Sequence, residues 1–103
     1  MTDLDNLQQS ATRAAQLLKS MSNSSRLLIL CTLIESPGTT AGELARLTGL
    51  SPSAASQHLA IMKDDQLIEF KRDAQKIHYF IKDESVFKIV KALKEIFCPQ
   101  EKA

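Results

Sequence analysis

The chain has 103 residues, 44% of them hydrophobic, which is enough for one domain with a modest core and too few for two domains. Its 13 basic and 12 acidic residues leave a net charge of +1, which excludes nucleic-acid binding through an overall positive field and makes any basic surface local. No apolar run approaches the roughly 20 residues of a membrane span, and the polar N-terminus does not resemble a secretory signal. We therefore expect a cytoplasmic protein with no membrane partner.

The first predicted element is an amphipathic helix near the N-terminus. Its apolar stripe recurs at three- and four-residue steps and consists of Leu4, Leu7, Ala11, Ala14 and Leu18. A second helix follows, in which Cys31 shares one side with Leu27, Leu28 and Ile34. On this side a cysteine can act simply as a small buried hydrophobe.

Residues 40–62 have the spacing of a helix-turn-helix. Thr40 can cap the first helix while Glu43, three residues on, reaches back to the Thr40 amide. Gly49 supplies the positive φ angle that ends this short helix. Ser51 followed by Pro52 is typical of an N-cap with proline at the first helical position, so a second helix begins there.

The second helix of this motif has a packing face and a free polar face. At about 100° per residue, Ala55, Leu59 and Met62 share the packing face. On the free face, Gln57 can pair with adenine and Ser53 with several base edges. An αα-hairpin with a polar surface is the alternative interpretation. The DNA-binding residues expected here are Ser51, Ser53, Ala54, Ser56, Gln57, His58 and Lys63, although His58 could instead pack.

Two short alternating runs, residues 68–70 and 77–81, predict a β-hairpin. Residues 71–76 between them form a basic tip of the kind that lies on phosphates. We expect phosphate contacts from Lys71, Arg72 and Lys76. A solvated loop that blunts a sheet edge is the alternative interpretation of these charges. The helix with Ser53 and Gln57 that precedes the hairpin favours phosphate binding over this alternative. The elements together predict a mainly α, winged helix-turn-helix fold in the order helix, helix, helix, helix, strand, strand, helix.

The last predicted element is a second amphipathic helix, whose stripe consists of Val86, Ile89, Val90, Leu93, Ile96 and Phe97. A core of this size can cover one terminal stripe, so the second indicates packing between subunits. We predict a homodimer whose contacts include Leu4, Leu7, Ala11, Leu18, Val90, Leu93 and Phe97. The alternative is that both helices fold onto their own core. We place residues 1–99 in the single domain and residues 100–103 in a loose tail.

Residues 25–30, 42–45, 50–59 and 68–79 together resemble the ArsR/SmtB family of bacterial repressors, and the likeness covers nearly the whole chain. The resemblance implies a winged helix-turn-helix homodimer that binds a palindromic operator and releases it when an inducer arrives. Matched by position, Ser53, Ser56 and Gln57 correspond to base-reading residues of the family. Arg72, Gln75 and Lys76 correspond to the wing tip of the family.

The metal sensors of this family carry ligands that the sequence lacks. One of their sites uses Cys-x-Cys on the helix before the turn, where residues 42–46 hold no thiol, and another uses Asp and His on the last helix, where residues 83–97 hold no histidine. Zinc generally requires Cys or His, and packing explains His58 and His78 better than coordination. We expect no metal site and no cofactor, and a metal or another ligand remains the alternative inducer.

Cys31 and Cys98 offer a different chemistry. Cys98 lies about 140° from the apolar stripe, and Pro99 disfavours the α-conformation for it, so we expect an accessible thiol at a frayed helix end. An accessible thiol near a second one is the arrangement of a redox sensor with a resolving partner. A small thiol enzyme would need a base beside its cysteine, and an interaction module would not need Ser53, Gln57 and a basic wing together.

The cysteine positions resemble the persulfide-responsive branch of the family. That branch has one cysteine on the second helix in an Ile-Leu-Cys run and one at the end of the last helix, and Cys31 and Cys98 lie in those places. The resemblance implies that reactive sulfur species join Cys31 and Cys98 through a di-, tri- or tetrasulfide. The bridged dimer would then bind operator DNA poorly.

Overall fold

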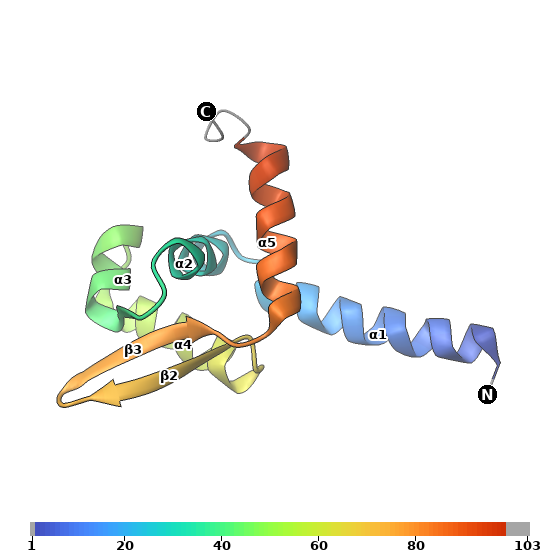
Figure 1. Ribbon diagram of the computed structural model, residues 1–103, viewed down its shortest axis with the longest axis horizontal. Coiled ribbons are helices and arrows are strands. Elements are labelled where there is room, and N and C mark those ends of the chain that lie inside the picture. The colour runs from blue at the N-terminus through green and yellow to red at the C-terminus, as the bar shows by residue number, and fades with distance from the viewer. Residues whose placement is uncertain (1, 99–103) are drawn as a thin grey trace.

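The computed structural model describes residues 2–98, and the predicted tail, residues 100–103, lies outside this part. The elements, in chain order, are α1 (Asp3–Met21), α2 (Ser24–Glu35), β1 (Thr39–Thr40), α3 (Ala41–Thr48), α4 (Pro52–Asp64), β2 (Ile68–Asp73), β3 (Lys76–Ile81) and α5 (Glu84–Phe97). They form a mainly helical, winged helix-turn-helix fold, as the sequence predicts (Figure 1). No helix among the described residues is long and apolar enough to cross a membrane.

The expected order of elements is wrong in one respect, because it omits β1. The sheet has three antiparallel strands in the order β1-β3-β2, with Thr39 opposite Tyr79 and Thr40 opposite His78. The Gly38 amide donates to the Tyr79 carbonyl at 2.8 Å, which extends the pairing by one residue. A two-residue strand is too short to show alternation, so its pairing with a distant strand is what creates it.

The hairpin tip is also narrower than the sequence predicts. β2 continues to Asp73 and β3 starts at Lys76, so Ala74 and Gln75 alone form the turn, with Ala74 at a φ of 57°. Lys71 and Arg72 belong to the ladder rather than to a loop. The charged residues end the hydrophobic alternation, but backbone pairing continues beyond it because a two-residue turn keeps the strands together.

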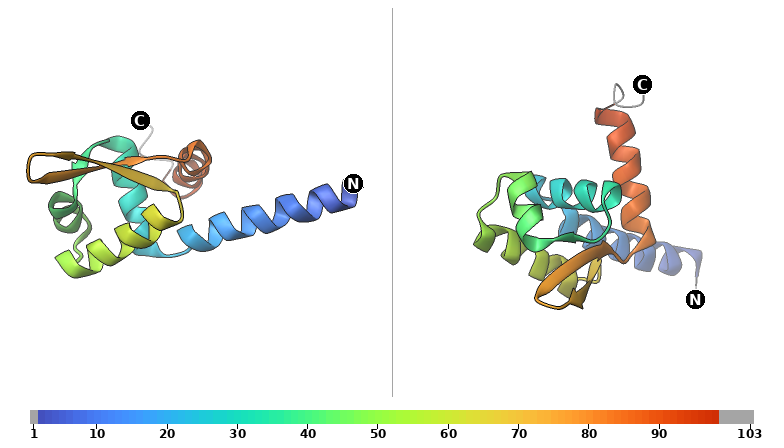
Figure 2. Two further views of the ribbon diagram at one scale, coloured as in Figure 1. Left: turned by 90° about the horizontal axis from the view of Figure 1, so that it is seen from below. Right: turned by 60° about the vertical axis from the view of Figure 1, so that its left-hand side comes forward.

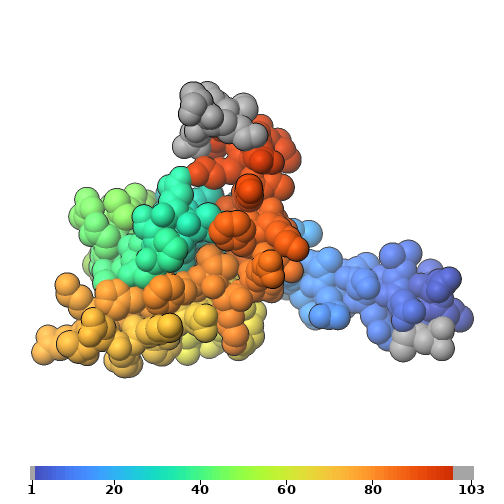
Figure 3. Space-filling view, in the orientation of Figure 1, coloured from blue at the N-terminus to red at the C-terminus, as the bar shows by residue number. Residues whose placement is uncertain are grey.

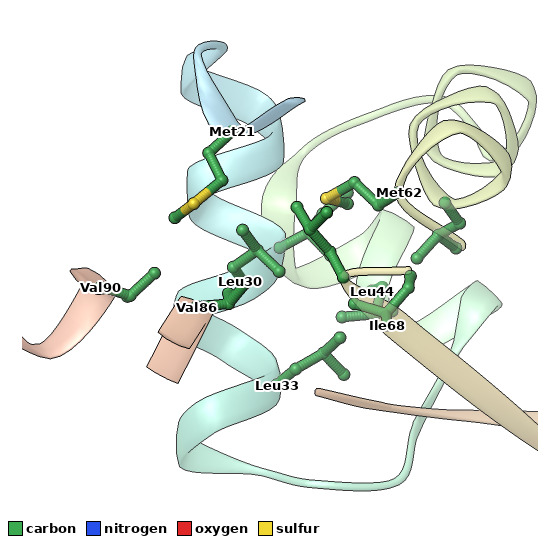
Figure 4. Packing of buried hydrophobic residues seen from close by; sticks show 11 residues of the cluster. Met21, Leu30, Leu33, Leu44, Met62, Ile68, Val86 and Val90 are labelled. Carbon is green, nitrogen blue, oxygen red and sulfur yellow. The ribbon is translucent and has the colours of Figure 1, made fainter. Parts of the chain in front are cut away.

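One hydrophobic cluster connects the helices to the sheet (Figure 4). α2 lies within this cluster, between α5 on one side and α3 and β2 on the other. The 11 residues of the cluster are Met21, Ile29, Leu30, Leu33, Leu44, Leu59, Met62, Leu67, Ile68, Val86 and Val90. This shared cluster therefore holds the helix-turn-helix and the hairpin in fixed positions relative to each other.

The two terminal helices extend beyond this core. α1 projects away from the rest of the molecule in Figure 1 and in the left view of Figure 2, and only its C-terminal end is anchored, at Ser20 and Met21. The space-filling view shows the same isolation of α1 (Figure 3). α5 starts in the core at Val86 and ends exposed at Ile96 and Phe97. Each helix thus has an anchored half and an exposed half.

Val90 does not fit the set of expected dimer contacts. Its side chain is 1% exposed and belongs to the chain's own core. The helical stripe of α5 serves two purposes, because its first turns cover the core and its last turns face outward. A periodic pattern shows which side of a helix is apolar but not what covers each turn of it.

Candidate nucleic-acid interface

The helix-turn-helix is held by the caps that its sequence predicts, with one exception. The Thr40 hydroxyl accepts from the Glu43 amide at 3.3 Å, and the Ser51 hydroxyl accepts from the Ala54 amide at 3.1 Å. Gly49 ends α3 at a φ of 73°. The Glu43 carboxylate does not return to the Thr40 amide, since it accepts from Arg46 instead. This charge-assisted bond holds the pKa of Glu43 below its ordinary value.

The two faces of α4 separate as the sequence predicts. Ala55, Leu59 and Met62 are each at most 1% exposed. Five of the expected DNA-binding residues of this segment, Ser51, Ser53, Ser56, Gln57 and Lys63, are exposed, whereas Ala54 is half-buried. The Ser51 hydroxyl acts as the helix cap. The polar face available to a groove is therefore formed by Ser53, Ser56 and Gln57.

His58 has a partner within the protein. Its side chain is half-buried, and its Nδ1 accepts a hydrogen bond from Arg26 Nε at 3.2 Å. The sequence left open whether His58 binds DNA or packs, and this geometry favours packing. Sequence analysis did not identify Arg26, because 32 positions separate it from His58 and no local pattern joins the two.

Two basic residues of the wing and one at the end of α4 lie over aromatic rings. Lys63 Nζ, at the end of α4, is 5.3 Å from the centre of the Phe70 ring, and the Arg72 guanidinium is 5.8 Å from the same ring. Lys71 Nζ is 5.4 Å from the centre of the Phe80 ring. Such contacts hold long cationic side chains close to a strand surface. Only the contact between Arg72 and Phe70 has a local signal in the sequence, because the two residues lie two positions apart on one strand and therefore share a face.

Lys71 and Arg72 lie on opposite faces of the hairpin, because successive strand residues alternate. Arg72 shares its face with Phe70 and Tyr79, whose rings are 6.1 Å apart. Burial raises the pKa of Tyr79, and the charge of Arg72 partly opposes that shift. Lys63 and Arg72 therefore form one basic cluster around Phe70, while Lys71 belongs to the other face. Gln75 and Lys76 are exposed at the tip.

Cys31 and Cys98 lie on the two helices that meet behind the interface. Cys31 is half-buried on α2. Cys98 is the C-cap of α5, and its amide donates to the Lys94 carbonyl at 2.8 Å. The helix ends there as expected, but the Cys98 side chain is half-buried rather than fully accessible. Lys94 also forms an ion pair with Glu35 of α2. Among residues 2–98, no three His, Cys, Asp or Glu side chains are grouped as a metal site.

Known proteins share this sequence and this fold. Residues 23–69 match the model of the bacterial regulatory proteins of the arsR family. The HTH-type transcriptional regulator YgaV of Escherichia coli K12 is 61% identical over 99 residues, which cover 96% of this chain and all of that protein. The chain belongs to the ArsR family. Its members are DNA-binding regulators, and this ArsR-family protein is accordingly not an enzyme.

Two solved structures of the family agree with this fold. Reduced HlyU from Vibrio cholerae superposes with a TM-score of 0.85 at 34% identity, covering 90% of this chain and 97% of HlyU. The transcriptional repressor BigR from Xylella fastidiosa superposes with a TM-score of 0.84 at 32% identity, covering 95% of this chain and 98% of BigR. With YgaV, these proteins belong to the branch of the ArsR family that the cysteine positions resemble, so that resemblance is confirmed.

Proposed function

We propose that this protein is a homodimeric repressor that binds a palindromic operator and releases it when reactive sulfur species join Cys31 to Cys98. The observation that carries the DNA-binding part is the exposed polar face of α4, Ser53, Ser56 and Gln57, followed by the basic cluster of Lys63 and Arg72. Amide and hydroxyl groups suit base edges, and cationic groups suit phosphates. The interface therefore offers both kinds of contact that a duplex requires.

The exposed apolar residues of the terminal helices support a dimer. Leu4, Leu7 and Leu18 on α1 are 62%, 66% and 52% exposed, and Phe97 at the end of α5 is 74% exposed. Several large apolar side chains exposed on the same two helices indicate a protein partner. A second copy related by two-fold symmetry would place the two α4 helices one DNA turn apart, about 34 Å, to match two half-sites.

The relation between α2 and α5 supports the sulfur switch. The Glu35–Lys94 ion pair joins the two helices, and Cys31 and Cys98 each lie four residues from one member of the pair. A disulfide requires Cα atoms within about 7 Å, whereas each added sulfur atom lets the bridge span a wider gap. The length of the bridge can therefore determine which oxidant the protein senses.

The proposed chemistry uses a low-molecular-weight persulfide, RSSH, as the oxidant. One cysteine thiolate attacks the terminal sulfur of RSSH, which gives a cysteine persulfide and releases RSH. The thiolate of the other cysteine then attacks the sulfur bonded to the first cysteine, which gives the disulfide and releases hydrogen sulfide. Two cysteine persulfides instead give the trisulfide, again with release of hydrogen sulfide. In each case the thiols are oxidised and sulfane sulfur is reduced to sulfide.

The test compares Cys31→Ser and Cys98→Ser with the wild-type protein. Each variant should keep the DNA affinity of the reduced protein and lose its response to persulfide, because either change removes one end of the bridge. Mass spectrometry after parallel treatment with persulfide, peroxide and diamide separates sulfur sensing from general oxidation. A single variant that still releases DNA with persulfide would disprove the two-cysteine mechanism and direct the search to another inducer.

A further inference from the structure

A set of polar contacts ties the recognition helix α4 to the junction between α1 and α2. Arg26, near the start of α2, donates from Nε to His58 Nδ1 at 3.2 Å and from Nη1 to the Ser20 carbonyl at 3.1 Å. The Ser20 hydroxyl donates to the carboxylate of Asp65, which is the C-cap of α4. The left view of Figure 2 shows the C-terminal half of α4 beside the end of α1, which are in contact.

These contacts hold α4 at two points on one face. His58 lies at the middle of α4 and Asp65 at its end, and both are tied to Ser20, one through Arg26 and the other directly. Ser20 is 8% exposed, so the residue that joins the two contacts is itself largely shielded from water. Two anchors along one helix fix its rotation about its own axis as well as its position.

Arginine suits this role better than lysine. Its guanidinium is planar and has five N–H donors in a rigid arrangement, so one side chain can bind two acceptors on different elements at fixed angles. Nε donates to the Nδ1 lone pair, which requires the His58 proton to be on Nε2. Arg26 is half-buried with these donors engaged, unlike the exposed Arg72 and Lys76 of the wing.

We infer that Arg26 is a positioning residue for DNA recognition, acting through His58 and Ser20. His58 directly follows Gln57, so the Arg26–His58 bond fixes the direction in which the polar face of α4 points. The Ser20 contacts fix this direction relative to α1, which carries the proposed dimer surface. The inference rests on the proposed DNA-binding face of α4 and is independent of the sulfur switch.

The test is a double-mutant cycle on the full chain with Arg26→Met, His58→Phe and the double variant. The specific probe is the tightest duplex that the wild-type protein selects from a random pool of about 30 base pairs, and the non-specific probe is its scrambled sequence. Each single change should weaken binding to the selected duplex about tenfold. The double variant should bind this duplex no more weakly than the single variant with the lower affinity, because both changes break the same bond. Binding to the scrambled duplex and the salt dependence should stay as in the wild type.

His58→Asn is the matched control, because the Asn carboxamide oxygen can accept near the position of Nδ1. It should restore binding to within about twofold, whereas His58→Phe keeps an aromatic ring and lacks the acceptor. Thermal melts of all variants verify folding. If Arg26→Met does not fold, the comparison of His58→Asn with His58→Phe decides the question alone, since His58 is only half-buried.

Several results would overturn the inference. Additive losses in the cycle would show that Arg26 and His58 act separately, and equal binding by Arg26→Met and wild type would show that Arg26 has no role. A fall of about one unit in the slope of log K against log salt for Arg26→Met would make it a phosphate contact. Failure of the proposed function is distinct from all of these, because the wild-type protein would then select no sequence.

Discussion

The DNA-reading half, residues 24–81, and helix α1 differ in where their apolar surface is covered. In the DNA-reading half, Leu44 and Leu59 are at most 1% exposed and pack within the chain. On α1, Leu4 and Leu7 are more than 60% exposed. Most of the stability of an amphipathic helix in a protein comes from tertiary packing of its apolar face. The DNA-reading half therefore has its apolar core covered within the chain, with Met21, Val86 and Val90 contributing, whereas the exposed stripe of α1 requires a partner, for which we propose a second copy of the chain.

The largest predicted effect is the loss of assembly in Leu18→Glu. A buried charge in the proposed interface should dissociate the dimer, and binding to the selected operator should fall by more than about 100-fold because the two half-sites are no longer linked. Sedimentation velocity and gel-shift titration measure the two effects. Thr12→Glu, off the apolar stripe of the same helix, is the control and should remain dimeric. A monomeric wild-type protein that still binds tightly would contradict the proposed arrangement.

Truncating one leucine in each region of a monomeric variant tests whether the DNA-reading half and α1 differ in how their apolar residues are packed. In the Leu18→Glu background, Leu59→Ala should lower the free energy of unfolding by about 2–5 kcal/mol, because it empties a fully buried position. Leu7→Ala in that background should change it by less than about 0.5 kcal/mol, since its side chain is already in water. Urea unfolding of both variants measures the difference. Similar losses for the two would mean that α1 packs on its own core.

The same division explains how much the sequence could predict. The helix-turn-helix was predictable because its signals are local: Thr40, Gly49 and Ser51 act on neighbouring amides, and the structure has all three caps. The packed face of α4 was predictable from its helical period. Elements defined by their own residues can be identified from a short window of sequence.

Features that depend on distant residues were not predictable. β1 exists because Thr39 and Thr40 pair with β3, and His78 Nδ1 donates to the Gly38 carbonyl 40 positions away at 2.7 Å. The Arg26–His58 bond also joins distant positions. The burial of Val90 depends on how far along α5 the core extends. In each case the tertiary fold, not the local pattern, provides the partner.

Base contacts and phosphate contacts within the DNA-reading half should be separable. Gln57→Ala should weaken binding to the selected duplex by about 1–3 kcal/mol and leave non-specific binding unchanged, because a bidentate base contact discriminates between sequences. Lys76→Ala should weaken both duplexes alike and lower the salt slope by about one unit. Titrations on both duplexes at several salt concentrations test this. An equal loss on both for Gln57→Ala would remove it from the base-reading set.

The smallest predicted effect concerns the turn of the helix-turn-helix, where Gly49 and Gly42 provide a matched pair. A Cβ at either position would meet no atom within 4 Å, so neither change causes a clash. Gly49 has a φ of 73°, which strains any side chain, whereas Gly42 lies in α3 without a positive φ. Gly49→Ala should lower the free energy of unfolding by about 1 kcal/mol, and Gly42→Ala should raise it by about 0.4–1 kcal/mol. Urea unfolding measures both, and changes of the same sign would contradict a purely conformational role for Gly49.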